Sequence, residues 1–155
     1  MGRSPIGPRF AAVLIALFAM VHAAWALSGP VFAAAAPRPT FLATGKFVGT
    51  DDAHKGEGNA LIVQLPTGQR FLRLEDFKVT NGPDLYVYLS GHPSPRSRAQ
   101  LHEGAAFEVG LLKGNVGNQN YELASSMDIT KFKSVVIYCK RFSVLFASAE
   151  LNFNR

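Results

Sequence analysis

The stretch SVVIYCKRFSVLFASAEL, residues Ser134 to Leu151, predicts two strands folded back on each other. Its first arm is rich in β-branched and aromatic residues, which favour a pleated backbone. Its second arm carries Val144, Leu145 and Phe146 before it ends in alanines. Lys140 and Arg141 are predicted to form the tip between the two arms. We take this hairpin as the element around which the rest of the chain is organised.

One face of the predicted hairpin is wholly apolar. Directly opposed residues of two antiparallel strands point to the same side of the sheet. Neither tip residue is the Gly or Asn that a tight primed turn prefers, so the register is open. A slip of one residue would move every side chain of one strand to the opposite face. The opposed pairs expected for this register are Cys139 with Phe142, Ile137 with Val144, and Val135 with Phe146.

Residues 1–36 have the pattern of an export signal and spacer and are left out of the fold. Arg3 and Arg9 precede an uncharged apolar run over residues 10–27, and small-residue cleavage patterns follow it. That run is near the minimum length for crossing a bilayer, so an uncleaved signal anchor is the alternative to a cleaved signal peptide. Residues 10–27 are the one membrane attachment that we expect. Either reading predicts a secreted or extracytoplasmic protein, in the periplasm or at the cell surface.

The remaining part of about 120 residues is long enough for one domain with its own core. Short apolar runs alternate with Gly, Pro and Asn turns, and neither an internal repeat nor an amphipathic helix of normal length is evident. This pattern predicts an all-β fold, a single antiparallel β-sandwich or flattened barrel of about seven to nine short strands. Besides the hairpin, strands or short segments are expected at residues 45–48, 60–65, 70–77, 85–90, 107–112 and 121–123.

Alternation along two of these strands predicts which side chains face the core. In strand 70–77, Leu72 and Leu74 share a face, and Phe77 lies on the opposite one. In strand 85–90, Tyr86 and Tyr88 alternate with Leu and Val, which indicates one face in the core. The polar stretch at residues 91–105 is predicted to be a surface loop.

Charge and motifs exclude several functions. The formal net charge of +5 includes Arg3 and Arg9, and the other cations are scattered among Asp and Glu. A basic stripe with interleaved aromatic residues is missing, so nucleic-acid binding is not predicted. The chain has no nucleophile elbow around a serine, and no histidine is placed relative to Cys139 as in a known hydrolase family. A stand-alone enzyme is therefore not indicated.

Six motifs occur in one order along the chain: GKF (45–47), His54, LRLEDF (72–77), GPDL (82–85), LKGNVGNQNY (112–121) and CKRFSVLF (139–146). Together they resemble the electron-transfer DM-thirteen (DM13) domain, the module of Skeletor- and Knickkopf-type extracellular proteins and of many exported bacterial proteins. The resemblance covers residues 44–153. It implies an all-β extracellular domain whose characteristic cysteine matches Cys139, with a redox role as a bare thiol or as a ligand to a prosthetic group such as haem.

Cys139 is the one cysteine of the chain, so an intrachain disulfide is excluded. The positive charges of Lys140 and Arg141 would favour the reactive thiolate of a neighbouring cysteine. The alternative is that Cys139 packs as a small hydrophobic residue in the core. A lone exposed thiol in an oxidising compartment would oxidise or form a disulfide with a second chain. Cys139 is therefore expected either to be protected by burial or to be kept for a redox function.

A metal or haem site would need further ligands. Covalent c-type haem is excluded because the chain lacks a C-x-x-C-H motif, and blue copper because no histidine follows Cys139. Non-covalent haem remains open, with Cys139, His54 or Met127 as the ligand. His54 is preferred among the histidines because it belongs to a motif of the resemblance, whereas His92 and His102 are interpreted as surface-loop residues. We predict no metal site.

The leading interpretation is an exported single-domain redox or electron-transfer module that uses Cys139 as a thiol or prosthetic-group ligand, with Lys140 and Arg141 as tuning cations. Its redox partner is not identified by the sequence. The alternative is a non-catalytic extracellular binding or structural module. In that case Cys139 is core packing, and the loops at residues 49–59 and 91–104 contact an extracellular ligand.

Overall fold

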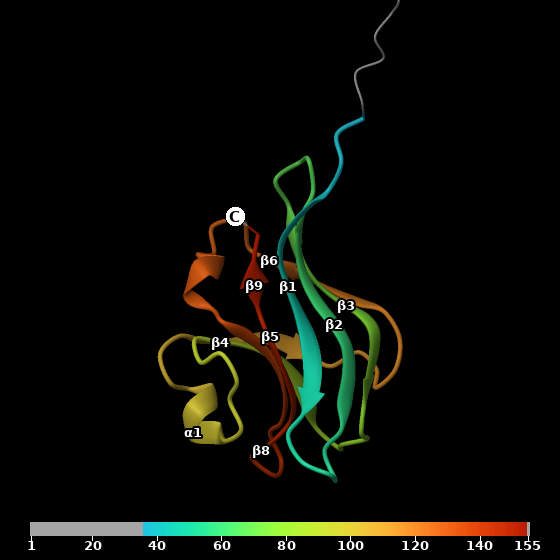
Figure 1. Cartoon of the computed structure of the whole chain (residues 1–155), viewed down its shortest axis with the longest axis vertical. Coiled ribbons are helices and arrows are strands. Elements are labelled where there is room, and N and C mark those ends of the chain that lie inside the picture. Colours follow the sequence, from blue (N-terminus) through green and yellow to red (C-terminus); the bar gives the residue numbers. More distant parts are fainter. Residues whose placement is uncertain (1–35, 155) are drawn as a thin grey trace, which may run out of the picture. The chain divides into compact units, whose positions relative to one another are not determined.

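Residues 36–154, the part of the chain described by the computed structural model, consist mainly of antiparallel strands (Figure 1). This confirms the predicted all-β class, whereas the predicted export signal lies outside the described residues. None of the described helices is long and apolar enough to span a membrane. The elements are β1 (Thr40–Gly49), β2 (Gly56–Gln64), β3 (Arg70–Val79), β4 (Leu85–Ser90), α1 (Arg98–Leu101), β5 (Ala106–Leu111), β6 (Gln119–Leu123), a 3-10 turn (Ile129–Lys131), β7 (Ser134–Cys139), β8 (Val144–Glu150) and β9 (Asn152–Phe153).

The strands form one antiparallel sheet in the order β5-β4-β7-β8-β1-β2-β3-β6, with β9 paired to β1. Strand β1 belongs to both halves of this sheet. Its residues Thr40 to Lys46 pair with β2, and Phe47 to Gly49 pair with β8. The sheet therefore folds over at β1 into the predicted sandwich, which approaches a closed barrel (Figure 1). Gly45 lies at this fold, where a Cβ atom would collide with the backbone carbonyl of Glu150, so only glycine permits the close approach.

Two apolar clusters hold the sheet. The main core fills the space between its two halves. The second cluster, here called the outer cluster, consists of Tyr88, Leu101, Val136, Tyr138 and Leu145. Strand β7 is buried along its whole length because it contributes side chains to both clusters. Leu101 is fully buried, so the stretch at residues 91–105 is not only the surface loop that we predicted: it folds α1 against the sheet.

The β7–β8 hairpin is confirmed, but its predicted register is wrong. The turn is four residues long, from Lys140 to Ser143, and Cys139 pairs with Val144 instead of Phe142. Ser143 adopts φ 54°, a left-handed conformation that the short apolar pattern did not reveal. A displacement of two residues preserves the face of each side chain, so Cys139 still faces the main core. Phe142 lies in the turn and is 63% exposed.

A bulge in β8 shifts the register further along the hairpin. Phe146 is the extra residue, because Tyr138 pairs with Leu145 and Ile137 pairs with Ala147. Ile137 therefore does not oppose Val144 as predicted. Phe146 and Ala147 both belong to the main core, as expected when an inserted residue interrupts the alternation of a strand.

A bulge in β3 interrupts the alternation of side chains predicted for residues 70–77, so the face predicted for Phe77 is wrong. Asp76 has φ 49°, and the β2–β3 pairing shifts at the opposing Gly58. The inserted residue turns Phe77 to the side of Leu72, although strict alternation placed these two on opposite faces. Phe77 is 1% exposed, and its ring meets the ring of Phe47 edge-on with centroids 5.1 Å apart.

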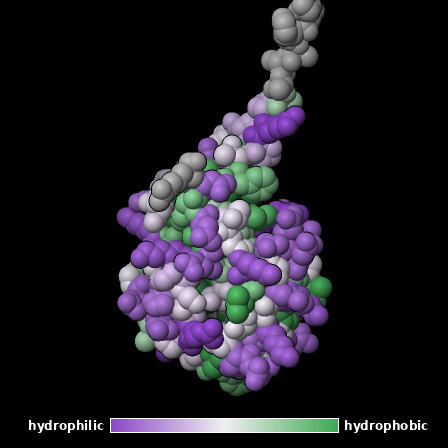
Figure 2. Space-filling model, in the orientation of Figure 1, coloured by the Kyte–Doolittle hydropathy of each residue, from purple (hydrophilic) through white to green (hydrophobic). Residues whose placement is uncertain are grey.

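The surface of the visible face is mainly hydrophilic, and hydrophobic residues are scattered over it in small groups (Figure 2). Apolar residues scattered singly are normal on protein surfaces, so this face by itself does not indicate a docking site.

Candidate functional site

Cys139 is the last residue of β7, and its side chain is completely buried. Its strand partners are Leu85 of β4 and Val144 of β8, and it belongs to the main core. The thiol is free. A soluble thiol or disulfide cannot reach the sulfur while the hairpin is closed, because exchange requires direct attack on sulfur. The closed structure therefore shows the packing geometry of this cysteine, one residue away from an exposed turn.

Lys140 faces away from the thiol toward the outer side of the sheet. Its ammonium nitrogen lies 2.7 Å from a carboxylate oxygen of Glu108 and 3.6 Å from the centroid of the Tyr86 ring. The hydrogen bond and charge of Glu108 raise the pKa of Lys140 above its ordinary value. Its backbone N–H donates to the carbonyl of Asp84 at 3.0 Å, which joins the turn to the neighbouring loop. Arg141 is exposed in the same turn. In the closed hairpin Lys140 thus holds the turn against β4 and β5, and we call these contacts the latch. Its ammonium group is directed away from the sulfur.

His54 lies against the main core through an aromatic contact. Its ring meets Phe146 edge-on, with centroids 4.4 Å apart. Its Nδ1 lies 2.9 Å from both carboxylate oxygens of Asp51, and that carboxylate also accepts the backbone N–H groups of Ala53 and His54. Phe146 and Cys139 are members of the same core cluster, so the structure brings His54 to the core that holds the thiol.

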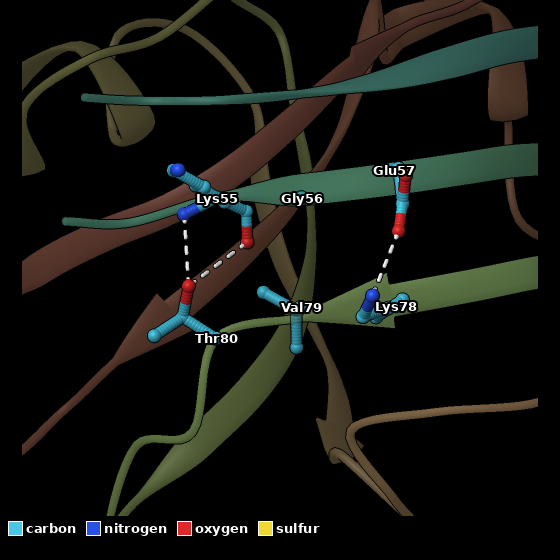
Figure 3. A pocket seen from close by; sticks show the side chains of 6 residues that line it. All are labelled: Lys55, Gly56, Glu57, Lys78, Val79 and Thr80. Atoms are coloured by element: carbon cyan, nitrogen blue, oxygen red, sulfur yellow. Dashed lines mark hydrogen bonds and ion pairs between the residues drawn. The ribbon is translucent and has the colours of Figure 1, made fainter. Parts of the chain in front are cut away.

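Thr80 holds the loop that carries His54. Its Oγ1 accepts the backbone N–H of Lys55 at 3.0 Å, and its own N–H donates to the Lys55 carbonyl at 3.0 Å. Figure 3 shows Thr80 facing the main chain of Lys55, while the Lys55 amino group points away. In the same hollow of about 250 Å³, Lys78 pairs with Glu57 at 3.3 Å. The Thr80 hydrogen bonds and the Lys78–Glu57 ion pair thus fix the loop beside this hollow.

The hydrogen bond to His54 couples the protonation of Asp51 to the stability of the protein at acidic pH. That bond lowers the pKa of Asp51 below its usual value of 3.8. A carboxyl with a depressed folded-state pKa stabilises the protein above its unfolded-state pKa, and this stability is lost as the pH falls through the folded-state value. We expect the unfolding free energy of the wild type to fall more steeply below about pH 4 than that of Asp51→Asn, as measured by urea unfolding across pH. Asp52→Asn is the matched exposed control, and parallel curves for wild type and Asp51→Asn would contradict the prediction.

Met127 precedes the 3-10 turn and packs against the main core. Its carbonyl accepts Nη1 of Arg70 at 3.0 Å, at the start of β3. The 3-10 turn that follows it lies toward the upper end of the sandwich in Figure 1, and the β7–β8 turn lies at the lower end. The segments that carry Cys139 and Met127 thus lie toward opposite ends of the sandwich, which does not favour a haem shared by these two residues. Within residues 36–154, no group of three or more His, Cys, Asp or Glu is placed to hold a metal ion.

A tyrosine group on the outer side of β4 and β7 was missed in the sequence analysis. The Tyr88 hydroxyl donates to Glu108 Oε2 at 2.6 Å, and its ring lies edge-on to Tyr138 with centroids 5.7 Å apart. The alternation of Tyr86 and Tyr88 with core residues was a usable signal, because it placed both tyrosines on one face. Glu108 could not be assigned to them, because it comes from β5, twenty residues later. A hollow of about 410 Å³ beside this group is lined by Tyr88, Arg98, His102, Tyr138, Lys140 and Ser143.

Comparison with known proteins agrees with the order of motifs in the sequence. A family model described as "Electron transfer DM13" matches residues 46–151. Neither the curated proteins nor the solved structures include a match to this chain.

Proposed function

The chain belongs to the electron-transfer DM13 family, and from this premise we propose that residues 44–153 form an exported redox module in which Cys139 is a guarded thiol. In the resting domain the sulfur is sealed in the core. It becomes available when the β7–β8 turn opens on a partner. The observation that carries this proposal is the complete burial of the chain's one thiol immediately before an exposed four-residue turn. Burial prevents idle oxidation, which an exposed lone thiol would undergo outside the cytoplasm.

The chemistry of an opened thiol is exchange with a disulfide. The Cys139 thiolate attacks one sulfur of the partner disulfide, a new sulfur–sulfur bond forms, and the other sulfur leaves as a thiolate. Lys140 and Arg141 lie in the opening segment, where their positive charges favour the thiolate once the latch is released. We propose the thiol rather than a resident haem as the carrier, because the completely buried sulfur is packed among core side chains. The module is proposed to act as a non-enzymatic partner of a disulfide-bearing protein.

The place of action follows from the sequence pattern at residues 1–36. We propose that this segment directs the domain out of the cytoplasm, as a cleaved signal peptide or as an anchor through residues 10–27. The domain then works as a secreted protein, in the periplasm or at the cell surface. The burial of its thiol is consistent with an oxidising compartment.

Substitution of Lys140 tests whether its side chain holds the turn closed or stabilises the Cys139 thiolate. If Lys140 holds the turn closed, Lys140→Ala opens it more often, and we expect iodoacetamide to alkylate Cys139 about two- to fivefold faster than in the wild type. If Lys140 mainly stabilises the thiolate, the same variant reacts more slowly. Arg141→Ala is the matched control, because it removes an adjacent exposed cation without a latch contact. The rate is measured by mass spectrometry of the folded, full-length protein.

The deciding experiment measures electron transfer to a disulfide probe. Reduced protein is mixed with oxidised glutathione, and we expect a mixed disulfide at Cys139 with release of one glutathione thiolate, whereas Cys139→Ala gives neither. The reaction is repeated over low urea concentrations. A rate that is faster than global unfolding permits, and that changes little with urea, supports local opening of the turn. A rate equal to that of global unfolding throughout leaves Cys139 as core packing and overturns the proposal.

A reaction rate equal to that of global unfolding would favour the binding module. One observation in the structure supports this alternative. Arg96 Nη1 donates to the carbonyl of Thr50 at 2.6 Å and so joins the two loops predicted as a contact surface. The joined loops border a hollow of about 320 Å³ that includes Lys46, Arg96 and Glu150. In this alternative the partner is an extracellular ligand, and Cys139 only packs.

A further inference from the structure

Tyr88 and Glu108 form a closely coupled proton donor and acceptor outside the thiol region. They are directly opposed on β4 and β5, and the phenolic oxygen lies 2.6 Å from Glu108 Oε2. Tyr88 is 8% exposed, so most of its side chain is shielded from water. Lys140 Nζ lies 2.7 Å from the same carboxylate oxygen. This arrangement defines where a proton leaving Tyr88 would go.

Two further tyrosines adjoin this pair. Tyr86 is opposed to Tyr138 across β4 and β7, and the Tyr138 ring lies edge-on to Tyr88. Tyr138 immediately precedes Cys139, so aromatic rings line the outer side of the strands whose inner side holds the thiol. The outer cluster therefore places oxidisable rings between the core and the hollow at the surface.

We propose that Tyr88 is a second redox site, oxidised by one electron as its phenolic proton moves to Glu108. The electron passes to an anionic one-electron acceptor in the hollow of about 410 Å³. The O–H bond of Tyr88 breaks and an O–H bond to Glu108 Oε2 forms, which leaves a neutral phenoxyl radical, a carboxylic acid and the reduced acceptor. Reduction reverses each transfer. This inference rests on electron transfer as the activity of the domain, but it does not require Cys139.

The protonation states suit this reaction. Burial and the hydrogen bond to Glu108 raise the pKa of Tyr88 well above its ordinary value, so the resting residue is a phenol. The hydrogen bonds from Lys140 and Tyr88 lower the pKa of Glu108, so the acceptor is ionised at neutral pH. Tyr121 provides a contrast within the same chain. Its hydroxyl donates to the amide oxygen of Gln119 at 2.8 Å, a group that is a poor proton acceptor.

The hollow indicates the chemical class of the acceptor. Arg98 and Lys140 line it together with His102, and the rings of Tyr88 and Tyr138 form part of its wall. Cations at the mouth of a cleft raise the local concentration of anions. An anionic acceptor would thus be held beside the ring that it oxidises.

Hexachloroiridate(IV), a dianionic one-electron oxidant, is the probe for this site. The full-length protein is mixed with it, frozen within milliseconds and examined by electron paramagnetic resonance. We expect a tyrosyl radical in the wild type, in Cys139→Ala and in the control Tyr121→Phe, and its loss in Tyr88→Phe. In Glu108→Gln the oxidation should slow by about 100-fold and its solvent deuterium isotope effect should change, because the proton acceptor is gone.

Each outcome decides the proposal. An unchanged radical in Tyr88→Phe, or none in the wild type, overturns it. An unchanged rate and isotope effect in Glu108→Gln shows that the hydrogen bond is only structural and overturns the proton transfer to Glu108. We expect this variant to fold, because Glu108 is an exposed residue. The Cys139→Ala arm separates the two proposals: a radical on Tyr88 in that variant upholds this site even if the thiol proves inert. Trp25 can also be oxidised, but it is present in every variant, so its contribution to the radical signal is the same in all of them.

Discussion

In the folded protein Cys139 should react with Ellman's reagent roughly 1,000-fold more slowly than an exposed cysteine. Its side chain is completely buried between Leu85 and Val144, so reaction must await an opening of the hairpin. An opening free energy of about 4 kcal/mol, near the lower end of global stabilities, gives a factor of this size. The absorbance change under excess reagent measures the rate directly.

The matched control moves the one thiol to the surface of the same turn. In the double variant Cys139→Ala, Phe142→Cys, the cysteine replaces a side chain that is 63% exposed, and we expect the rate of a free thiol. A wild-type rate within tenfold of this control would show that the hairpin does not seal Cys139. The guarded-thiol proposal would then be wrong, because the sulfur would be open to idle oxidation.

Phe77→Ala should lower the free energy of unfolding by about 3–5 kcal/mol. Phe77 is 1% exposed, and it packs edge-on against Phe47 where β1 approaches β8. Truncation removes a large buried apolar surface and leaves a cavity in a core that cannot fully collapse. Urea unfolding followed by circular dichroism measures the loss.

Phe41→Ala is the control for this substitution, since it makes the same chemical change at a side chain that is 50% exposed. Its expected loss is below about 1 kcal/mol. Equal losses at the two positions would mean that Phe77 is not a core residue, and the bulge at Asp76 would then have no packing consequence.

Local sequence patterns predicted the strands and the sidedness of Cys139, but not the effect of a bulge. The hairpin at Ser134–Leu151 and the strands of the sandwich were predictable, because β-branched runs bounded by turn residues specify strands locally. The face of Cys139 was also predictable despite the wrong turn length, because a register error of two residues preserves sidedness. Phe77 was placed incorrectly because one inserted residue, Asp76, reverses the alternation after it.

The candidate sites depended on contacts between distant segments. The pairing of Lys140 with Glu108 joins a turn to a strand 32 residues earlier in the chain. His54 meets the core through Phe146, a residue of the last long strand. Neither contact has a local sequence signal, because the first arises from the strand order β5-β4-β7 and the second from the pairing of β1 with β8.

The sequence by itself determined the all-β class, the hairpin, the family and the presence of one unpaired thiol, because composition, alternation and motif order are properties of neighbouring residues. The tertiary structure alone decided that this thiol is sealed, that Lys140 turns away from it, and that the Tyr88 hydroxyl donates a hydrogen bond to Glu108. Burial and proton contacts are set by which strands become neighbours, and bulges and long-range pairing control that choice.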